Sequence, residues 1–127
     1  MRDLSSNIGV SPSIAPAVIS AGTTNGAGVD LRGFDSASAV VAVGAIAGSG
    51  NMTIKLQDSD DNSTFADTVA DDRIGAFAAV LLTATTNDVG YIGGKRYVRA
   101  VATLNSGTSV AVSVVIVAGN SHRAPVV

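Results

Sequence analysis

The stretch that decides the fold spans residues 97 to 117 and reads YVRAVATLNSGTSVAVSVVIV. Every second residue in each half is apolar, which is the period of a β-strand that buries one face. The residues on these apolar faces are Val98, Ala100, Ala102 and Leu104, then Val110, Val112, Val114 and Ile116. The linking residues Asn105-Ser106-Gly107-Thr108 favour a turn. We therefore predict that the two halves pair as an antiparallel hairpin.

The same pattern extends towards the N-terminus. Met52, Ile54 and Leu56 alternate with polar residues, and short apolar stretches separated by turn signals follow the rest of the chain, at 18–21, 29–31, 37–47, 64–69, 77–83 and 90–92. The alanine-rich segment 74–82 is also compatible with a helix, but we assign it to a strand. The series predicts an all-β domain, an antiparallel β-sandwich or jelly roll of about eight strands.

The composition supports this fold class and excludes several others. All ten acidic residues are aspartates, whereas glutamate is absent, and the 127 residues include 14 glycines. Such a composition favours strands and turns over long helices. The absence of cysteine excludes disulfides and is consistent with a reducing cytoplasm, or a particle assembled there. The N-terminus lacks the pattern of a signal peptide, and no apolar run is long enough to span a bilayer.

Both ends of the chain contain proline and few turn signals. We expect residues 1–16 to form an extended N-terminal arm, residues 17–119 to form the β-sandwich, and residues 120–127 to form a C-terminal tail. In the arm, Ile8, Val10 and Ile14 offer apolar contacts to a neighbouring subunit. In the tail, the single histidine of the chain, His122, is expected on the surface.

The stretch DSDDNSTF, residues 58–65, resembles the start of a calcium-binding loop, with Asp58, Asp60 and Asn62 at the first, third and fifth positions. A calcium loop also requires glycine at the sixth position and glutamate at the twelfth. Ser63 and Val69 occupy these positions. We therefore predict a polar turn in which the aspartates and the asparagine bind their own backbone, and no metal site. The alternative is a weak calcium site shared with Asp67, Asp71 or Asp72.

The residues offer little basis for catalysis. A mechanism that needs histidine must use His122, which lies five residues from the end of the chain, and no G-x-S-x-G pattern is present. The glycine-rich stretches GTTNGAG and GAIAGSG lack the lysine of a phosphate-binding loop. We expect no enzyme activity and no cofactor. The net charge of −2 also argues against nucleic acid or an anionic membrane as a partner.

Several features favour protein partners instead. Tyr97 and Arg99 point away from the predicted core, and both residue types are common in interface anchors. Val115 and Val117 make the last strand apolar on both faces, as if another subunit covered it. Together with Ile8, Val10, Ile14 and His122, these residues form the predicted partner-binding set. We expect a homo-oligomer, either a dimer or a trimer.

Three segments carry a resemblance to a known family: VDLRGFDSASAVVAVGAI, IKLQDSDDNSTFAD and GYIGGKRYVRAVAT. Over roughly residues 28–119, the chain resembles small β-sandwich structural proteins of the virions of tailed bacteriophages and prophages. The resemblance implies a capsid decoration, or cement, protein on the outside of the head, bound to the major capsid protein or another virion protein. It implies no catalytic residues. The alternatives are another virion component, such as a head fibre, tail or adaptor protein, and a glycan-binding adhesion domain.

Overall fold

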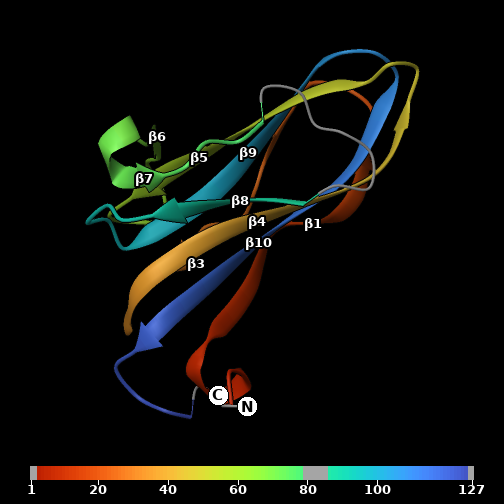
Figure 1. Ribbon diagram of the computed structural model, residues 1–127. Coiled ribbons are helices and arrows are strands. Elements are labelled where there is room, and N and C mark those ends of the chain that lie inside the picture. The colour runs from red at the N-terminus through yellow and green to blue at the C-terminus, as the bar shows by residue number, and fades with distance from the viewer. Residues whose placement is uncertain (1–2, 79–85, 126–127) are drawn as a thin grey trace.

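The computed structural model describes residues 3–78 and 86–125, and within them the chain forms a β-sandwich of two antiparallel sheets (Figure 1). This confirms the predicted all-β fold. The helical segments of this described chain are three-residue 3-10 turns at Ser5–Asn7 and Ala70–Asp72, and neither is long enough to cross a membrane.

The first sheet, which we call sheet A, contains five strands in the order β1, β10, β4, β8, β7. Their bounds are β1 Gly9–Ile19, β10 Ser109–Ser121, β4 Phe34–Ala47, β8 Thr86–Tyr91 and β7 Arg73–Ile74. The long strands β1, β10 and β4 lie side by side in the lower part of Figure 1. They pair through nearly their whole length, so that sheet A has a broad and continuous outer face.

The second sheet, sheet B, has β9 at its centre. Its order is β2, β9, β5, β6, and β3 also pairs with β9. The bounds are β2 Thr23–Asn25, β9 Tyr97–Ser106, β5 Asn51–Ser59, β6 Ala66–Asp67 and β3 Val29–Asp30.

The core lies between the two sheets, and the alternation in the sequence identified it correctly. All of the apolar positions predicted on β5, β9 and β10 are buried, except Leu104, which is partly buried against the same core. Met52, Val98, Val110 and Val114 are 0% exposed. The period-two pattern therefore gave the right buried face for these three strands.

The predicted hairpin is wrong, because its two strands belong to different sheets. β9 pairs with β5 in sheet B, whereas β10 pairs with β1 and β4 in sheet A. The turn at Gly107 therefore carries the chain from one sheet to the other across the core. Alternation shows that a strand buries one face, but a strand buries that face equally well in a hairpin and in an arch between sheets.

The predicted N-terminal arm is also wrong from Gly9 onward. Residues Gly9–Ile19 are extended, but they form the edge strand β1 of the sandwich itself. Pro12 and Pro16 are compatible with this position because an edge strand leaves half of its N–H groups unpaired. The register of β1 shifts between Pro12 and Ile14, and again between Ile14 and Ala17.

One residue of β1 also ties the two sheets together. The hydroxyl of Ser13 donates to the carbonyl of Ala27 at 2.8 Å and accepts the N–H of Ala100, in β9, at 2.9 Å. Ala27 returns a backbone bond to the carbonyl of Ser13 at 2.7 Å. Gly26 lies so close to Ser13 and to the carbonyl of Ala100 that a side chain on it would collide with both. β1 is thus an integral part of the domain.

The remaining predictions concern the C-terminal tail and the strand predicted within 74–82 and 77–83. The last strand, β10, continues to Ser121, so the predicted tail begins inside it. Ile74 belongs to the short strand β7, and residues 76–78 have no regular structure. The rest of the predicted strand, from residue 79, lies outside the described residues.

Candidate interaction surfaces

The outer face of sheet A carries a continuous apolar surface. Val10 lies opposite Val117, and Pro12 lies opposite Val115. On the other side of β10, Val115 lies opposite Val40. We call this surface the apolar face and define it by residues of β1, β10 and β4, namely Val10, Pro12, Val18, Val40, Ala42, Ala111, Ser113, Val115 and Val117.

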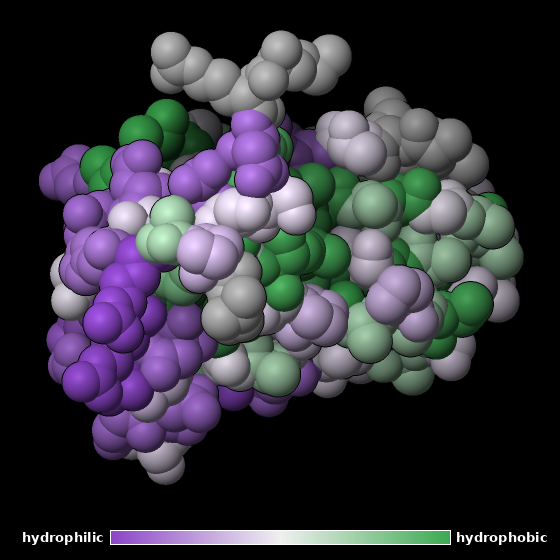
Figure 2. All heavy atoms as spheres, turned by 90° about the horizontal axis from the view of Figure 1, so that it is seen from below, coloured by the Kyte–Doolittle hydropathy of each residue, from purple (hydrophilic) through white to green (hydrophobic). Residues whose placement is uncertain are grey.

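This surface is unusual because the solvent side of an antiparallel sheet is ordinarily polar. Val10 and Val18 are 59% and 67% exposed. None of the residues that define the apolar face is charged, and the segments 4–29, 36–54 and 100–121 contain no charged residue at all. Asp88, opposite Val40 on the far side of β4, lies at the margin. On the face seen in Figure 2, hydrophobic and weakly polar residues lie over one half and hydrophilic residues over the other.

A shallow groove crosses the apolar face. Its volume is about 470 Å³, and its lining includes Pro16, Val18, Ala42, Gly44 and Ala111. Ala42 and Gly44 of β4 and Ala111 of β10 are small residues, and Pro16 and Val18 of β1 line the groove on the other side of β10. This relief makes the face suited to interdigitation with another apolar surface.

The structure brings together three of the predicted partner-binding residues and separates the others. Val10, Val115 and Val117 meet on the apolar face. Ile8 is half-buried just before β1. Ile14 is a correction to the prediction, because it is only 4% exposed and lies in the core beside Val114. The register shifts around Ile14 place it on the inner side of β1, so it cannot contact a partner.

Tyr97 and Arg99 lie on the outer face of sheet B, on the opposite side of the sandwich from the apolar face. The guanidinium of Arg99 donates two hydrogen bonds to Oε1 of Gln57, at 2.9 and 2.7 Å, and stacks 4.1 Å from the ring centre of Phe65. Arg96 lies 5.0 Å from the ring centre of Tyr97. Arg99 therefore binds within its own domain, and these residues do not adjoin the valines.

His122 connects the C-terminal tail to the start of β4. Its backbone N–H donates to the carbonyl of Gly33 at 2.8 Å, and its Nε2 lies 2.7 Å from Oδ1 of Asp35. Both side chains are exposed. The imidazole thus holds the tail against its own domain.

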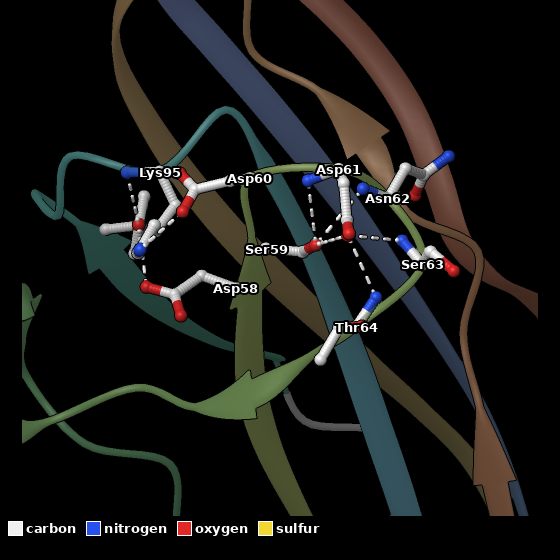
Figure 3. A network of polar contacts seen from close by, with 9 residues as sticks. Asp58, Ser59, Asp60, Asp61, Asn62, Ser63, Thr64 and Lys95 are labelled. Carbon is white, nitrogen blue, oxygen red and sulfur yellow. Dashed lines mark hydrogen bonds and ion pairs between the residues drawn. The ribbon is translucent and has the colours of Figure 1, made fainter.

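The acidic stretch 58–65 forms the predicted polar turn (Figure 3). Oδ1 of Asp61 accepts the N–H groups of Ser63 and Thr64, both at 2.9 Å, and Ser59 donates its hydroxyl to the same atom. The two backbone bonds, with the bond from Ser59 after them, hold the pKa of Asp61 below its usual value. Asn62 adopts a left-handed conformation with φ of 59°. These local bonds confirm the predicted turn, but Asp61 alone of its three aspartates binds the backbone of the turn, whereas Asp58 and Asp60 pair with Tyr91 and Lys95.

The residues in the calcium-like register do not converge on one point, because Asp58 and Asp60 each have a partner outside the turn and Asn62 lies on the other side of it. Asp58 accepts the hydroxyl proton of Tyr91 at 2.9 Å, and Asp60 pairs with Nζ of Lys95 at 2.6 Å. In Figure 3, these two carboxylates lie towards Lys95, whereas Asp61 turns towards Ser63 and Thr64. In the described ranges 3–78 and 86–125, no three acidic or histidine side chains come together in a way that would hold a metal ion.

Sequence reasoning missed a cleft at the charged end of the sandwich. The cleft measures about 430 Å³ and lies between residues 31–37 and 91–96, with Leu31, Phe34, Tyr91, Lys95 and Arg96 among its lining. The guanidinium of Arg96 forms a bidentate ion pair with the carboxylate of Asp30, with hydrogen bonds of 2.9 and 2.7 Å. The stretches LRGFDSA and GGKR lie far apart in the sequence, and no local pattern in either indicates that they meet.

Comparison with known proteins shows the fold. No family model matches the chain, and neither does any curated protein. The solved structure of the SPBc2 prophage-derived protein YomS is similar, with a TM-score of 0.51. The match covers 88% of this chain and 92% of YomS at 16% sequence identity. At this low sequence identity, the similarity shows a shared fold and no more.

Proposed function

We propose that this chain is a non-enzymatic structural protein of a phage virion, of the decoration or cement type, that binds the outside of the head shell and bridges capsid subunits. The observation that carries the proposal is the exposed, uncharged apolar face of sheet A. A β-sandwich with such a face acts through contact with other proteins. The similarity in fold to a prophage-derived protein supports the phage setting.

The polar side chains support a structural role over a catalytic one. The carboxylates of Asp58, Asp60 and Asp61 accept hydrogen bonds or pair within the domain, and His122 holds the tail. These interactions stabilise turns and join strands. The proposed partner is the major capsid protein or another virion protein, and the proposed location is the surface of the capsid. Many such contacts, repeated by the symmetry of a shell, sum to strong binding even when each is weak.

The cleft beside Phe34 and Tyr91 supports a second candidate, a glycan-binding domain exposed on the virion. Its aromatic and charged lining is of the kind that binds polar ligands. A glycan array probed with the purified chain separates this candidate from a purely structural role.

Purified particles test the main proposal. Particles released by the strain that encodes the chain are analysed by mass spectrometry, and the chain is located with gold-labelled antibody in electron micrographs. We expect the chain on the head, in many copies per particle. Particles lacking the chain should release their genome at a lower temperature than complete particles. Adding the purified chain should raise the release temperature to that of complete particles. Absence of the chain from particles would refute the proposal.

A further inference from the structure

We infer that the apolar face of sheet A binds a second copy of this chain, so that two sandwiches stack with their A sheets face to face. The inference rests on the proposed function, in which the chain acts through contacts with proteins, and it assigns this face to a contact between copies of the chain, which leaves the charged end with its cleft for the virion partner. Self-association is measured on the purified chain without particles. The inferred dimer can therefore fail while the proposed role in the virion stands, and the reverse.

The first argument concerns charge. The residues that define the apolar face carry no charge, and Asp88 lies only at its margin. When a two-fold axis brings a surface against itself, each buried charge on that surface loses its hydration, and a charge near the axis also meets its own like charge. A face without charges avoids both costs. The charged half of the molecule, seen as the hydrophilic half in Figure 2, would be a poor surface for the same contact.

The second argument concerns size. The strands β1, β4 and β10 contain 11, 14 and 13 residues. Because alternate residues of a strand face outward, roughly 19 residues of these strands lie on the outer face. A standard stable interface uses about 20 to 30 residues on each side. The outer face of these three strands therefore reaches the lower limit of the size of a standard interface.

The third argument concerns the edges of sheet A, the other route by which two copies could join. The edge strand β1 contains Pro12 and Pro16, which lack N–H donors, and its register shifts twice. Proline and bulges at an edge oppose the addition of another strand. At the other edge, β7 is only two residues long. Stacking through the face is thus favoured over pairing through an edge.

The chain supplies a matched pair of variants for the test. Val10, on the apolar face, is 59% exposed, and Val69, away from it and just before the turn Ala70–Asp72, is 60% exposed. The substitutions Val10→Asp and Val69→Asp therefore place the same charge at equally exposed valines. Sedimentation equilibrium of the purified full chain measures self-association. We expect a species of twice the 12.6 kDa chain mass. Val10→Asp should raise the dimer Kd about tenfold or more, because a carboxylate would be buried in the contact. Val69→Asp should leave the dimer Kd unchanged.

A cysteine variant keeps the inference testable if Val10→Asp fails to fold. Because the natural chain has no cysteine, Val117→Cys and Val69→Cys each introduce a single thiol. With a short bifunctional thiol crosslinker, we expect Val117→Cys to give covalent dimers and Val69→Cys to remain monomeric. A chain that stays monomeric up to about 100 μM would overturn the inference. So would a dimer that both aspartate substitutions weaken equally, or one that crosslinks only through Val69→Cys.

Discussion

Tyr91 joins the two sheets through its hydroxyl group. The hydroxyl donates to Asp58, in sheet B, at 2.9 Å and accepts the backbone N–H of Lys95 at 3.1 Å. Tyr91 and Asp58 are only 4% and 9% exposed. Burial raises the pKa of Tyr91 well above its ordinary value, so the phenol stays protonated and able to donate.

We expect Tyr91→Phe to lower the free energy of unfolding by about 1–3 kcal/mol, because the buried carboxylate of Asp58 and the N–H of Lys95 lose their partner. Urea denaturation followed by circular dichroism measures the change. Tyr97→Phe, at a half-buried tyrosine on the outer face of sheet B, is the control and should cost much less. Equal losses in the two variants would contradict this role of the Tyr91 hydroxyl.

Asp30 makes a pH-dependent contribution to stability. Its hydrogen bonds from Arg96, the main cause, and from the N–H of Arg32 hold its pKa below the ordinary aspartate value. A carboxylate with a lowered pKa stabilises the fold above the unfolded value of about 4, and this contribution disappears as pH falls through the folded pKa. The pair is partly exposed, which limits its contribution to about 1 kcal/mol or less.

We therefore expect Asp30→Asn to be less stable than the natural chain near neutral pH and equally stable at about pH 2. Thermal unfolding across this pH range measures the difference. Asp71→Asn changes an exposed carboxylate without an ion-pair partner in the described chain, and it should leave the profile unchanged. A difference for Asp30→Asn that persists at pH 2 would show that the pair acts through something other than charge.

At the scale of the elements, β1 is the strand for which the prediction and the structure differ most. It looks like a free arm in the sequence because two prolines interrupt it. In the structure, Ser13 bridges it to sheet B, and Ile14 and Ile19 enter the core at 4% and 7% exposure.

We expect Ser13→Ala to destabilise the domain by about 1–3 kcal/mol, since the N–H of Ala100 would be buried without its acceptor. Ser11→Ala, at an exposed position of the same strand, should have almost no effect. Chemical denaturation of both variants gives the comparison. If Ser13→Ala proved as harmless as Ser11→Ala, β1 would not be held through this bridge.

The loop between β5 and β6 gives a prediction about metal. Asp58 and Asp60 bind Tyr91 and Lys95, and Asp61 binds the backbone of the loop, so calcium would have to break these bonds. We expect no calcium binding tighter than about 10 μM, the range of sensor loops. Isothermal titration calorimetry with CaCl2 measures this, and a tighter site would require the loop to rearrange.

At the scale of the whole molecule, hydrophilic residues lie over one half of the face seen in Figure 2, and hydrophobic and weakly polar residues lie over the other. The apolar face suits a permanent contact, while the charged end, with its cleft, remains available to another partner. The proposed bridging of capsid subunits would use both surfaces.

This separation predicts how salt affects self-association. Because the apolar face lacks charge, we expect the dimer Kd to change less than about threefold between 0.1 and 1 M NaCl, whereas a contact through the charged end would weaken strongly. Sedimentation equilibrium at several salt concentrations measures this. Marked dissociation in high salt would show that the copies meet through the charged end.

The sequence alone determined the fold class and the inner face of the main strands. Alternation at Met52 to Leu56, Val98 to Leu104 and Val110 to Ile116 records which side of each strand avoids water, and this is a local property. The turn at 58–65 was equally predictable, because its bonds join residues close in the chain. The sequence also showed that β10 is apolar at Val115 and Val117 on its outer face, because residue type and strand alternation are local properties.

Only the tertiary structure decided which strands are neighbours. Alternation is the same whether β10 pairs with β9 or crosses to the other sheet, so the sequence could not exclude the hairpin. It was likewise the register of β1 on β10 that buried Ile14 and set Val10 beside Val117. The bridges from Ser13 to Ala100 and from Tyr91 to Asp58 join residues 87 and 33 positions apart. Such contacts depend on how the whole chain packs, and no local pattern records them.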